Sequence, residues 1–189
     1  MSPRTVLVLG GVRAGKSAFA VSRATERGGR VVFVATAEAV DAEMAERIAR
    51  HRAERPSSWR TVEVPLALPS TLSALRGETD VVVADCLNFW VANLLGKRPE
   101  LSDADLLAEA ADLEAAATRP GYELILVSNE VGWGIHPETA LGRRFRDALG
   151  VVNQAAARAA DDVVLMVAGC PLFVKSDGAP ALPDRGRLG

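Results

Sequence analysis

Short apolar runs recur along the chain, and a longer segment of mixed polarity follows each one. Val6-Leu7-Val8-Leu9 and Val31-Val32-Phe33-Val34 are continuous rather than alternating. A continuous run of this length is typical of a strand buried on both faces, as in a parallel sheet covered by helices. The expected strands span residues 5–9, 31–34, 59–64, 81–85, 124–127 and 163–167, the last being the final strand of the chain.

The segments between these runs carry helical periodicity. Residues 38–52 have acidic side chains early and arginines late, a polarity that suits the helix dipole. One face of this helix is expected to carry Val40, Met44, Ile48 and His51. The expected helices span residues 17–27, 38–52, 70–76, 86–96, 103–118 and 138–160, with Gly150 as a candidate break point in the last.

The stretch from Gly10 to Ser17 lies between an expected strand and an expected helix. Its sequence, Gly-Gly-Val-Arg-Ala-Gly-Lys-Ser, has the pattern and the strand–loop–helix context of a phosphate-binding loop. Glycines let backbone N–H groups turn toward an anion, and the helix N-terminus adds further donors. Lys16 is then expected to reach the β- and γ-phosphates of a nucleoside triphosphate.

The strand at residues 81–85 ends in Asp85 after four apolar residues. A carboxylate at this position is typical of a Walker B strand, which holds the Mg²⁺ of a bound nucleotide. The Ser17 hydroxyl is the other expected protein ligand. Ser17 and Asp85 are therefore the predicted metal-binding residues.

Strands and helices alternate, and polar residues of catalytic or ligand-binding types follow several strands. The alternation predicts a doubly wound α/β sheet, here the P-loop NTPase-type three-layer fold with a mostly parallel sheet flanked by helices. Ligands of such sheets bind at the carboxyl ends of the strands. The residues expected to converge there are Gly10–Ser17, Thr36, Asp85 and Asn129-Glu130. One domain is expected over residues 1–175, with a flexible C-terminal tail over 176–189.

Composition narrows the classes of function. Hydrophobic residues make up 49% of the 189 residues, enough for a sizeable core. The formal net charge of -2 gives no general nucleic-acid-binding surface. No apolar run is long enough to span a membrane and no secretory leader is evident, so a cytoplasmic location is expected. Cys86 and Cys170 have no metal-ligand spacing and are expected to be small buried thiols.

The two histidines are candidate nucleophiles or acid–base groups. His51 lies between two arginines, which favour its neutral form and can stabilise phosphate charge. Attack of this imidazole on a nucleotide phosphorus would give a phosphoramidate, whereas a structural histidine on a helix face would do no chemistry. His136 precedes a proline in a glycine-rich loop, and a structural or incidental role is expected for it.

Two further carboxylates follow strands. Glu63 and Glu130 are either site residues or solvated surface acids, and the residues alone leave both interpretations open. The glycine-punctuated loop at residues 131–137 is likewise either a ligand lid or a connection. The chain has no Asn-Lys-x-Asp sequence of the kind that regulatory GTPases use for guanine, so any guanine preference must come from elsewhere.

Several of these stretches together resemble one family, the bifunctional adenosylcobinamide kinase/adenosylcobinamide-phosphate guanylyltransferases of cobalamin biosynthesis. The resemblance covers about residues 5–175 and is most specific in the helix that ends near His51 and in the Ser-Asn-Glu-Val-Gly stretch at residues 128–132. The other matching stretches are residues 10–17, 35–37, 41–52, 55–56, 59–63, 85–87, 143–147, 152–154 and 167–169.

The resemblance implies two reactions. An NTP, either ATP or GTP, phosphorylates the aminopropanol hydroxyl of adenosylcobinamide, and GTP then guanylylates a histidine that passes GMP to the corrinoid phosphate. Carried over to this chain, the catalytic residues are His51 and Lys16. The implied nucleotide-binding residues are Gly10, Gly11, Val12, Arg13, Ala14, Gly15, Lys16, Ser17, Ala35, Thr36, Ala37, His51, Arg52, Ala53, Glu54, Glu63 and Asp85.

The family also implies a homotrimer. This sequence departs from the family's pattern in the tail after Lys175, which has no clear counterpart there, and at two further positions. Some members have two adjacent histidines where this chain has Arg50-His51, and the family usually has an apolar residue at the position of His136. The expected partners are a corrinoid and nucleoside triphosphates with Mg²⁺, and neither nucleic acid nor a membrane.

Two other classes of protein stay open beside this one. A monofunctional small-molecule P-loop kinase would keep the phosphate loop and leave His51 structural. A nucleotide-binding regulatory protein would hydrolyse NTP slowly at most and would need a partner surface, for which the sequence shows no evident helix or basic patch.

Overall fold

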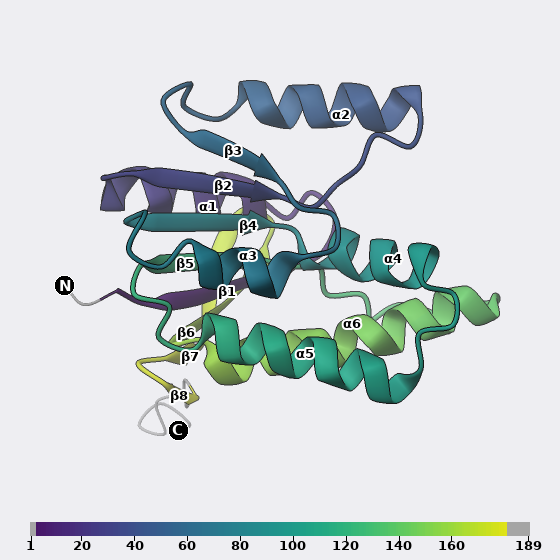
Figure 1. Cartoon of the computed structure of the whole chain (residues 1–189). Helices are drawn as coiled ribbons and strands as arrows, with labels where there is room; N and C mark the ends of the chain where they lie inside the picture. The colour runs from purple at the N-terminus through teal and green to yellow at the C-terminus, as the bar shows by residue number, and fades with distance from the viewer. Residues whose placement is uncertain (1–2, 181–189) are drawn as a thin grey trace, which may run out of the picture.

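Figure 1 shows the computed structural model of the chain, which describes residues 3–180. Strands and helices alternate as the apolar runs predict. The elements are, in chain order, β1 (Thr5–Gly10), α1 (Lys16–Arg27), β2 (Val31–Ala35), α2 (Ala42–Ala53), β3 (Arg60–Glu63), α3 (Leu68–Ala74), β4 (Val81–Asp85), α4 (Leu87–Lys97), α5 (Asp103–Ala117), β5 (Glu123–Val127), α6 (Ala140–Ala159), β6 (Asp162–Val167), β7 (Cys170–Ser176) and β8 (Ala179–Pro180).

The strands form one sheet in the order β3-β2-β4-β5-β1-β6-β7-β8. The strands from β3 to β6 in this order run parallel, while β7 and β8 are antiparallel additions at one edge. Strand β5 therefore lies between β1, which leads into the phosphate loop, and β4, which ends in Asp85. In its register Val127 pairs with both Val8 and Asp85, so β4 and β5 end level and β1 continues beyond them to Gly10.

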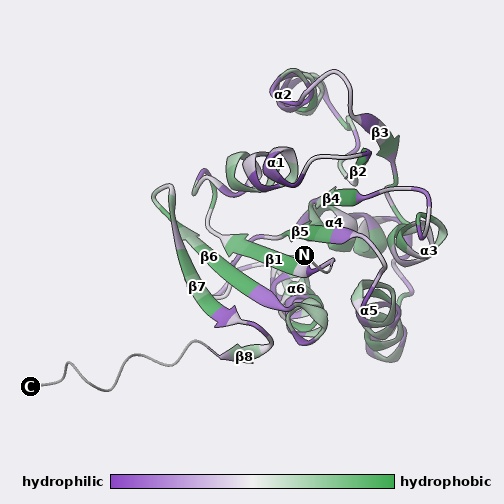
Figure 2. Cartoon of the chain, turned by 90° about the vertical axis from the view of Figure 1, so that its left-hand side faces the viewer, coloured by the Kyte–Doolittle hydropathy of each residue, from purple (hydrophilic) through white to green (hydrophobic). Residues whose placement is uncertain are grey.

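Helices cover both faces of the sheet (Figure 2). Helix α1 packs on one face against apolar side chains such as Val8 and Phe33. Helices α3, α4, α5 and α6 pack on the other face, where Trp90 and Leu124 are fully buried. Continuous apolar strands are needed because both faces are buried. The predicted P-loop NTPase-type three-layer architecture is confirmed.

Helix α2 stands apart from these layers, above β2 and β3 in Figure 1. It begins four residues later than its charge pattern predicts, because Asp41 caps it by accepting a hydrogen bond from the Met44 N–H at 2.7 Å. Val40 therefore precedes the helix and is 79% exposed. No residue of α2 is buried, although Met44, Ile48 and His51 are among its less exposed positions.

Three expectations about the C-terminal half are wrong. Helix α6 continues through Gly150, because the flanking Leu149 and Val152 are fully buried and outweigh the cost of about 1 kcal/mol that glycine imposes on a helix. Strand β6 is not the last strand, since β7 and β8 follow it. Cys170 begins β7 and is exposed, while Cys86 is buried as expected.

The boundary between domain and tail, predicted at residue 175, stays a prediction. Within the expected tail, Ser176 completes β7, and residues 179–180 form β8 beside it. Residues 181–189 of the expected tail lie outside the described residues.

Candidate active site

The phosphate loop is held against the neighbouring strand β6 by its first glycine. Gly10 has a φ of 151°, and a Cβ there would lie 2.6 Å from the Met166 carbonyl oxygen. At the other end, Gly15 adopts the left-handed conformation with a φ of 97° and serves as the N-cap of α1. Both positions require glycine, so the sequence pattern reflects the close curl of the backbone.

Lys16 lies in the first turn of α1 and is only 8% exposed. Its ammonium donates hydrogen bonds to the carbonyl oxygens of Gly10 at 3.0 Å and Gly11 at 2.7 Å. Burial lowers the pKa of Lys16 from its ordinary value, an effect that Cys86 and Asp85 oppose. The loop therefore holds a largely desolvated cation next to its own backbone, where phosphate charge is best stabilised.

The Ser17 hydroxyl and the Asp85 carboxylate meet across the sheet. Ser17 Oγ donates to Asp85 Oδ2 at 2.8 Å, which joins the start of α1 to the end of β4. A hydroxyl and a carboxylate are hard oxygen ligands that fit Mg²⁺, an ion usually completed by water and substrate phosphates. Within residues 3–180, no group of three or more His, Cys, Asp or Glu side chains is placed to hold a metal ion. A metal bound at Ser17 and Asp85 would therefore take further ligands from a substrate.

Thr36 supports Asp85 from the neighbouring strand. Its hydroxyl donates to the Cys86 carbonyl at 2.7 Å and accepts from the Cys86 N–H at 2.8 Å. Asn93 donates to the Thr36 carbonyl at 2.8 Å. The Thr36 hydroxyl thus makes its hydrogen bonds to the protein backbone, and these bonds fix the turn that follows Asp85. The Cys86 thiol in this turn is inert, because burial raises its pKa.

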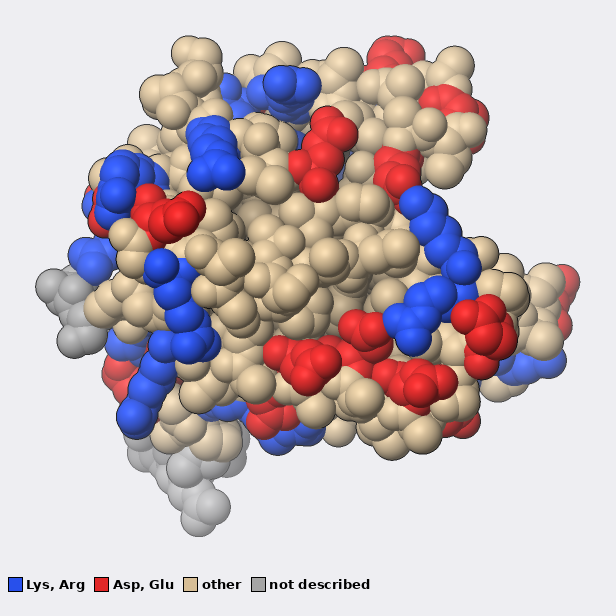
Figure 3. Space-filling model, viewed as in Figure 1, with Lys and Arg blue, Asp and Glu red and all other residues tan. Residues whose placement is uncertain are grey.

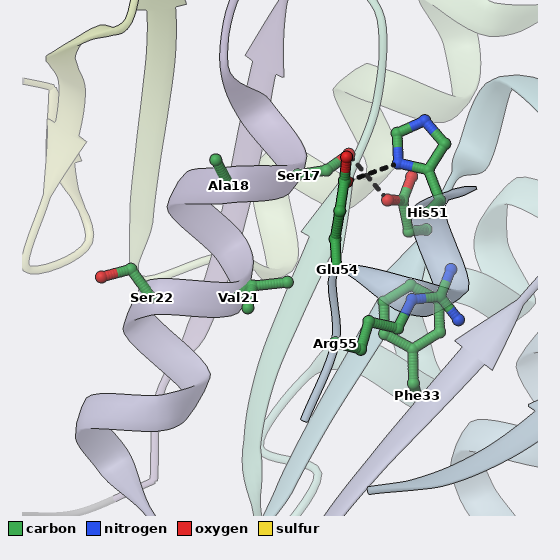
Figure 4. A pocket seen from close by; sticks show the side chains of 9 residues that line it. Ser17, Ala18, Val21, Ser22, Phe33, His51, Glu54 and Arg55 are labelled. Carbon is green, nitrogen blue, oxygen red and sulfur yellow. Dashed lines mark hydrogen bonds and ion pairs between the residues drawn. The ribbon is translucent and has the colours of Figure 1, made fainter. Parts of the chain in front are cut away.

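The C-terminal end of α2 and the start of α1 enclose a cavity of about 400 Å³ (Figure 4). A cavity of this size is in the range of ligand pockets. Its lining includes His51 from α2 and Glu54, the C-cap of α2, together with Ser17 and Asp85. His51 Nδ1 lies 3.3 Å from Glu54 Oε2. A proton on Nδ1 is favoured by this carboxylate and leaves the lone pair on Nε2.

Arg55 and Phe33 line the same cavity, and neither is among the residues that the sequence predicts for the site. The Arg55 guanidinium lies over the Phe33 ring, 3.3 Å from its centroid, in a cation–π contact. Burial lowers the pKa of Arg55, although a guanidinium stays charged in proteins. The Arg55-Pro56 dipeptide is one of the stretches shared with the resembled family, and this match is the sequence feature that points to Arg55 as a site residue.

Other predicted residues are not part of the lining of this cavity. Glu63 ends β3, the edge strand, and pairs with Ala35, which pairs with Asp85, so Glu63 is two strand spacings, or roughly 10 Å, from a cavity residue. Arg52 and Ala53 are exposed on α2. Glu130 lies beside the phosphate loop, where its N–H donates to the Gly10 carbonyl at 3.2 Å. His136 lies in the loop after β5, with its Nδ1 3.0 Å from Arg146 Nη1.

A glycine-locked loop, a buried lysine and a Ser–Asp pair at the carboxyl ends of a parallel sheet define a P-loop nucleotide-binding protein. The sequence model of one family, cobinamide kinase / cobinamide phosphate guanyltransferase, matches residues 6–174. The chain belongs to this family and is therefore a transferase.

Curated relatives support this assignment. The chain is 44% identical over 172 residues to the bifunctional adenosylcobalamin biosynthesis protein CobP of Pseudomonas aeruginosa, covering 90% of this chain and 97% of that protein. It is 39% identical over 180 residues to the bifunctional adenosylcobalamin biosynthesis protein CobU of Escherichia coli, covering 90% and 99% of the two chains.

Solved structures of lower similarity support the fold alone. The RadB recombinase superposes with a TM-score of 0.51 at 17% identity, over 87% of this chain and 74% of that chain. An ATP synthase subunit, NeqB from Nanoarcheaum equitans, superposes with a TM-score of 0.54 at 11% identity, over 87% of this chain and 45% of that chain.

Figure 3 shows how charged side chains are distributed on one face of the molecule. Lys and Arg side chains are interspersed with Asp and Glu on the face that Figure 3 shows, rather than gathered in a basic patch. None of the helices within residues 3–180 combines the length and the apolar character that crossing a membrane requires.

Proposed function

We propose that the chain carries out both reactions of its family. In the first, ATP or GTP phosphorylates the aminopropanol hydroxyl of adenosylcobinamide. In the second, GMP passes from GTP through a guanylyl-histidine to that phosphate, giving adenosylcobinamide-GDP. One observation carries the proposal: His51 lines the same cavity as Ser17 and Asp85, so a nucleophile and a phosphate site face each other.

The phosphate loop performs the first reaction by positioning and electrostatics. Its N–H groups and the Lys16 ammonium bind the β- and γ-phosphates, and the charge that develops in the transition state falls on groups that are already oriented. Ser17 and Asp85 would hold Mg²⁺, which neutralises phosphate charge when bound. The substrate hydroxyl attacks the γ-phosphorus, and the bond to the β-bridging oxygen breaks.

His51 performs the second reaction in two steps. Its Nε2 lone pair attacks the α-phosphorus of GTP, the bond from that phosphorus to the bridging oxygen breaks, and pyrophosphate leaves. A phosphate oxygen of the corrinoid then attacks the same phosphorus, and the P–N bond breaks to restore the imidazole. Glu54 beside Nδ1 orients the ring and stabilises the cationic form that arises during attack.

Arg55 supplies a fixed positive charge for the second reaction. It is half-buried, it is held over Phe33, and it lines the cavity next to His51. A guanidinium in this place can stabilise the negative charge on the α-phosphate oxygens as the bond to His51 forms.

Labelling with α-³²P-GTP tests the covalent step. Incubation followed by denaturation should leave label on the wild-type chain and none on His51→Ala. The second histidine supplies a matched control, and His136→Ala should label like the wild type. Label that survives equally on His51→Ala, or that is absent from the wild type, would overturn the covalent mechanism.

The same experiment separates the alternatives. A monofunctional kinase would form adenosylcobinamide phosphate without labelling, and a regulatory nucleotide-binding protein would show NTP turnover that does not depend on adenosylcobinamide. Product analysis with adenosylcobinamide, ATP and GTP distinguishes all three outcomes and also reports which NTP the kinase step prefers.

The assembly and the location of the protein follow from the resemblance only. We propose a homotrimer in the cytoplasm, with one catalytic domain over residues 1–175. Light scattering on the purified protein tests the trimer, for which a mass of three chains of 20.0 kDa is expected.

A further inference from the structure

Glu130 lies at the point where β5 meets the phosphate loop. Beyond the last paired residues of β5, the ladder to β1 continues through the Ser128 N–H, which donates to the Val8 carbonyl at 2.9 Å, and the Glu130 N–H, which donates to the Gly10 carbonyl at 3.2 Å. Glu130 is therefore tied by its backbone to the first residue of the loop.

The Gly10 carbonyl is also an acceptor for Lys16 Nζ, at 3.0 Å. The Glu130 nitrogen and the Lys16 ammonium share this one oxygen, so they are no more than about 6 Å apart. Lys16 is the residue that binds the phosphoryl group to be transferred. The Glu130 backbone consequently lies beside the phosphate loop, close to the cation that is proposed to contact the γ-phosphate.

The carboxylate of Glu130 is available as a proton acceptor. Its Oε1 accepts a hydrogen bond from the Gly132 N–H at 2.7 Å, which fixes the side chain and leaves the other oxygen to accept a further bond. Among residues 3–180 it forms no ion pair, whereas Glu54 pairs with His51 and Glu38 with Lys97. Asp85 is engaged with Ser17, and Glu63 is several strands away.

A buried polar network holds the backbone around Glu130. Ser128 Oγ donates to Asn153 Oδ1 at 2.6 Å, and Asn153 Nδ2 donates to the Asn129 carbonyl at 3.1 Å. Ser128 is fully buried, and Asn153 lies on the core side of α6 with 9% exposure. A satisfied buried network of this kind rigidifies the segment that it contacts, as a catalytic group requires.

We propose that Glu130 is the general base of the phosphoryl-transfer reaction, an inference that rests on the proposed function. The substrate hydroxyl gives its proton to the Glu130 carboxylate while its oxygen forms the bond to the γ-phosphorus. The bond from that phosphorus to the β-bridging oxygen breaks, and NDP leaves. The protonated Glu130 then loses its proton to water. Guanylylation of His51 does not use this group.

Glu130→Gln tests the inference, because glutamine keeps an oxygen for the Gly132 N–H and loses only the basic carboxylate. Formation of adenosylcobinamide phosphate should slow by about 10²–10⁴-fold in kcat, the usual contribution of a positioned base. Labelling of His51 by α-³²P-GTP should stay within about twofold of the wild type, because the nucleotide site is unchanged. The matched control is Glu138→Gln, an exposed glutamate of the following loop, which should leave both reactions unchanged.

A kinase rate within about threefold of the wild type in Glu130→Gln would overturn the inference and leave Glu130 as a turn-forming residue. Equal losses in both reactions would also overturn it, because Glu130 would then act on the fold or on nucleotide binding. Glu130→Asp gives a second measurement. Aspartate keeps a carboxylate on a side chain that is one methylene shorter, so its kcat should fall between those of the wild type and Glu130→Gln. A wild-type enzyme that forms no phosphorylated corrinoid would overturn the proposed function itself.

Discussion

The phosphate loop and the end of helix α2 contribute to the same cavity but are built in opposite ways. The loop is locked by Gly10 against β6, and its Lys16, in the first turn of α1, is 8% exposed. Helix α2 has no buried residue, and the His51 side chain at its end is 39% exposed. The group proposed to bind phosphate is therefore fixed by the fold, and the group proposed to react covalently lies on a lightly anchored element.

This difference follows from the chemistry that each part supplies. Electrostatic stabilisation works best when the dipoles and charges are oriented before the reaction and are shielded from water. A nucleophile that accepts GMP and then gives it to a second substrate must be reached by two different molecules. Elements that must admit or release ligands usually have low local stability.

Replacing the proposed catalytic side chain of either region should give the largest effects. Lys16→Ala should lower both the kinase rate and the rate of guanylylation by about 10²–10³-fold, because we propose one phosphate site for both reactions. His51→Ala should abolish guanylylation and leave the kinase rate within about threefold. Rates measured separately for the two reactions test the comparison. Loss of only one reaction in Lys16→Ala would mean that the reactions use separate nucleotide sites.

Truncations in the two regions should differ in stability. Leu94→Ala on α4 removes a side chain that is 1% exposed and should lower the free energy of unfolding by about 2–5 kcal/mol. Ile48→Ala on α2, which is only half-buried, should cost about 0.5–1 kcal/mol. Urea denaturation measures both values. A cost for Ile48→Ala as large as that for Leu94→Ala would show that α2 is anchored as firmly as the core.

The pH dependence of nucleotide use should reflect the burial of Lys16 and give the smallest effect. Desolvation lowers the pKa of Lys16 below its ordinary value of 10.5, so its charge is lost earlier as the pH rises. We expect kcat/KM for NTP in the kinase reaction to fall on an alkaline limb whose apparent pKa is below 10.5. The limb of kcat should lie at higher pH, because bound phosphates favour the ammonium. Activity that stays constant to above the ordinary value would contradict this expectation.

Burial also fixes the sign of the effect of Lys16 on stability. Its folded-state pKa is lowered, so the folded state binds this proton less readily than the unfolded chain does. The contribution of Lys16 to the stability of the fold therefore improves as the pH rises from the folded to the unfolded pKa of this residue. The same rise in pH weakens phosphate binding, which means that stability and affinity change in opposite directions.

The sequence predicts the fixed part of the site well, because its information is local. The eight residues from Gly10 to Ser17 specify a loop, a helix start and a cation, and the Val81–Asp85 run places a carboxylate at a strand end. Parallel strands bring these ends together whatever the loops do. The Ser17–Asp85 hydrogen bond is the direct result.

The parts that the sequence does not predict depend on distant contacts. Arg55 enters the cavity because it packs on Phe33, which is 22 residues away and on another element. Strand β7 carries an apolar run but pairs antiparallel to β6 at the edge of the sheet, and its residues are mostly exposed. The charge pattern of residues 38–52 begins upstream of the helix, and only the Asp41 side chain marks the actual helix start.

The exposure of α2 has an evolutionary consequence. Natural proteins lie close to a stability threshold, so substitutions at buried positions are tightly limited by folding. Substitutions on a helix with no buried residue are nearly free of that limit. Under the proposed function, residues around His51 are therefore limited by chemistry rather than by folding, and nucleotidyl transfer can be retuned or lost while the sheet and its phosphate loop stay intact. A kinase core with a replaceable transferase helix would let lineages vary one half of the chemistry at little risk to the other.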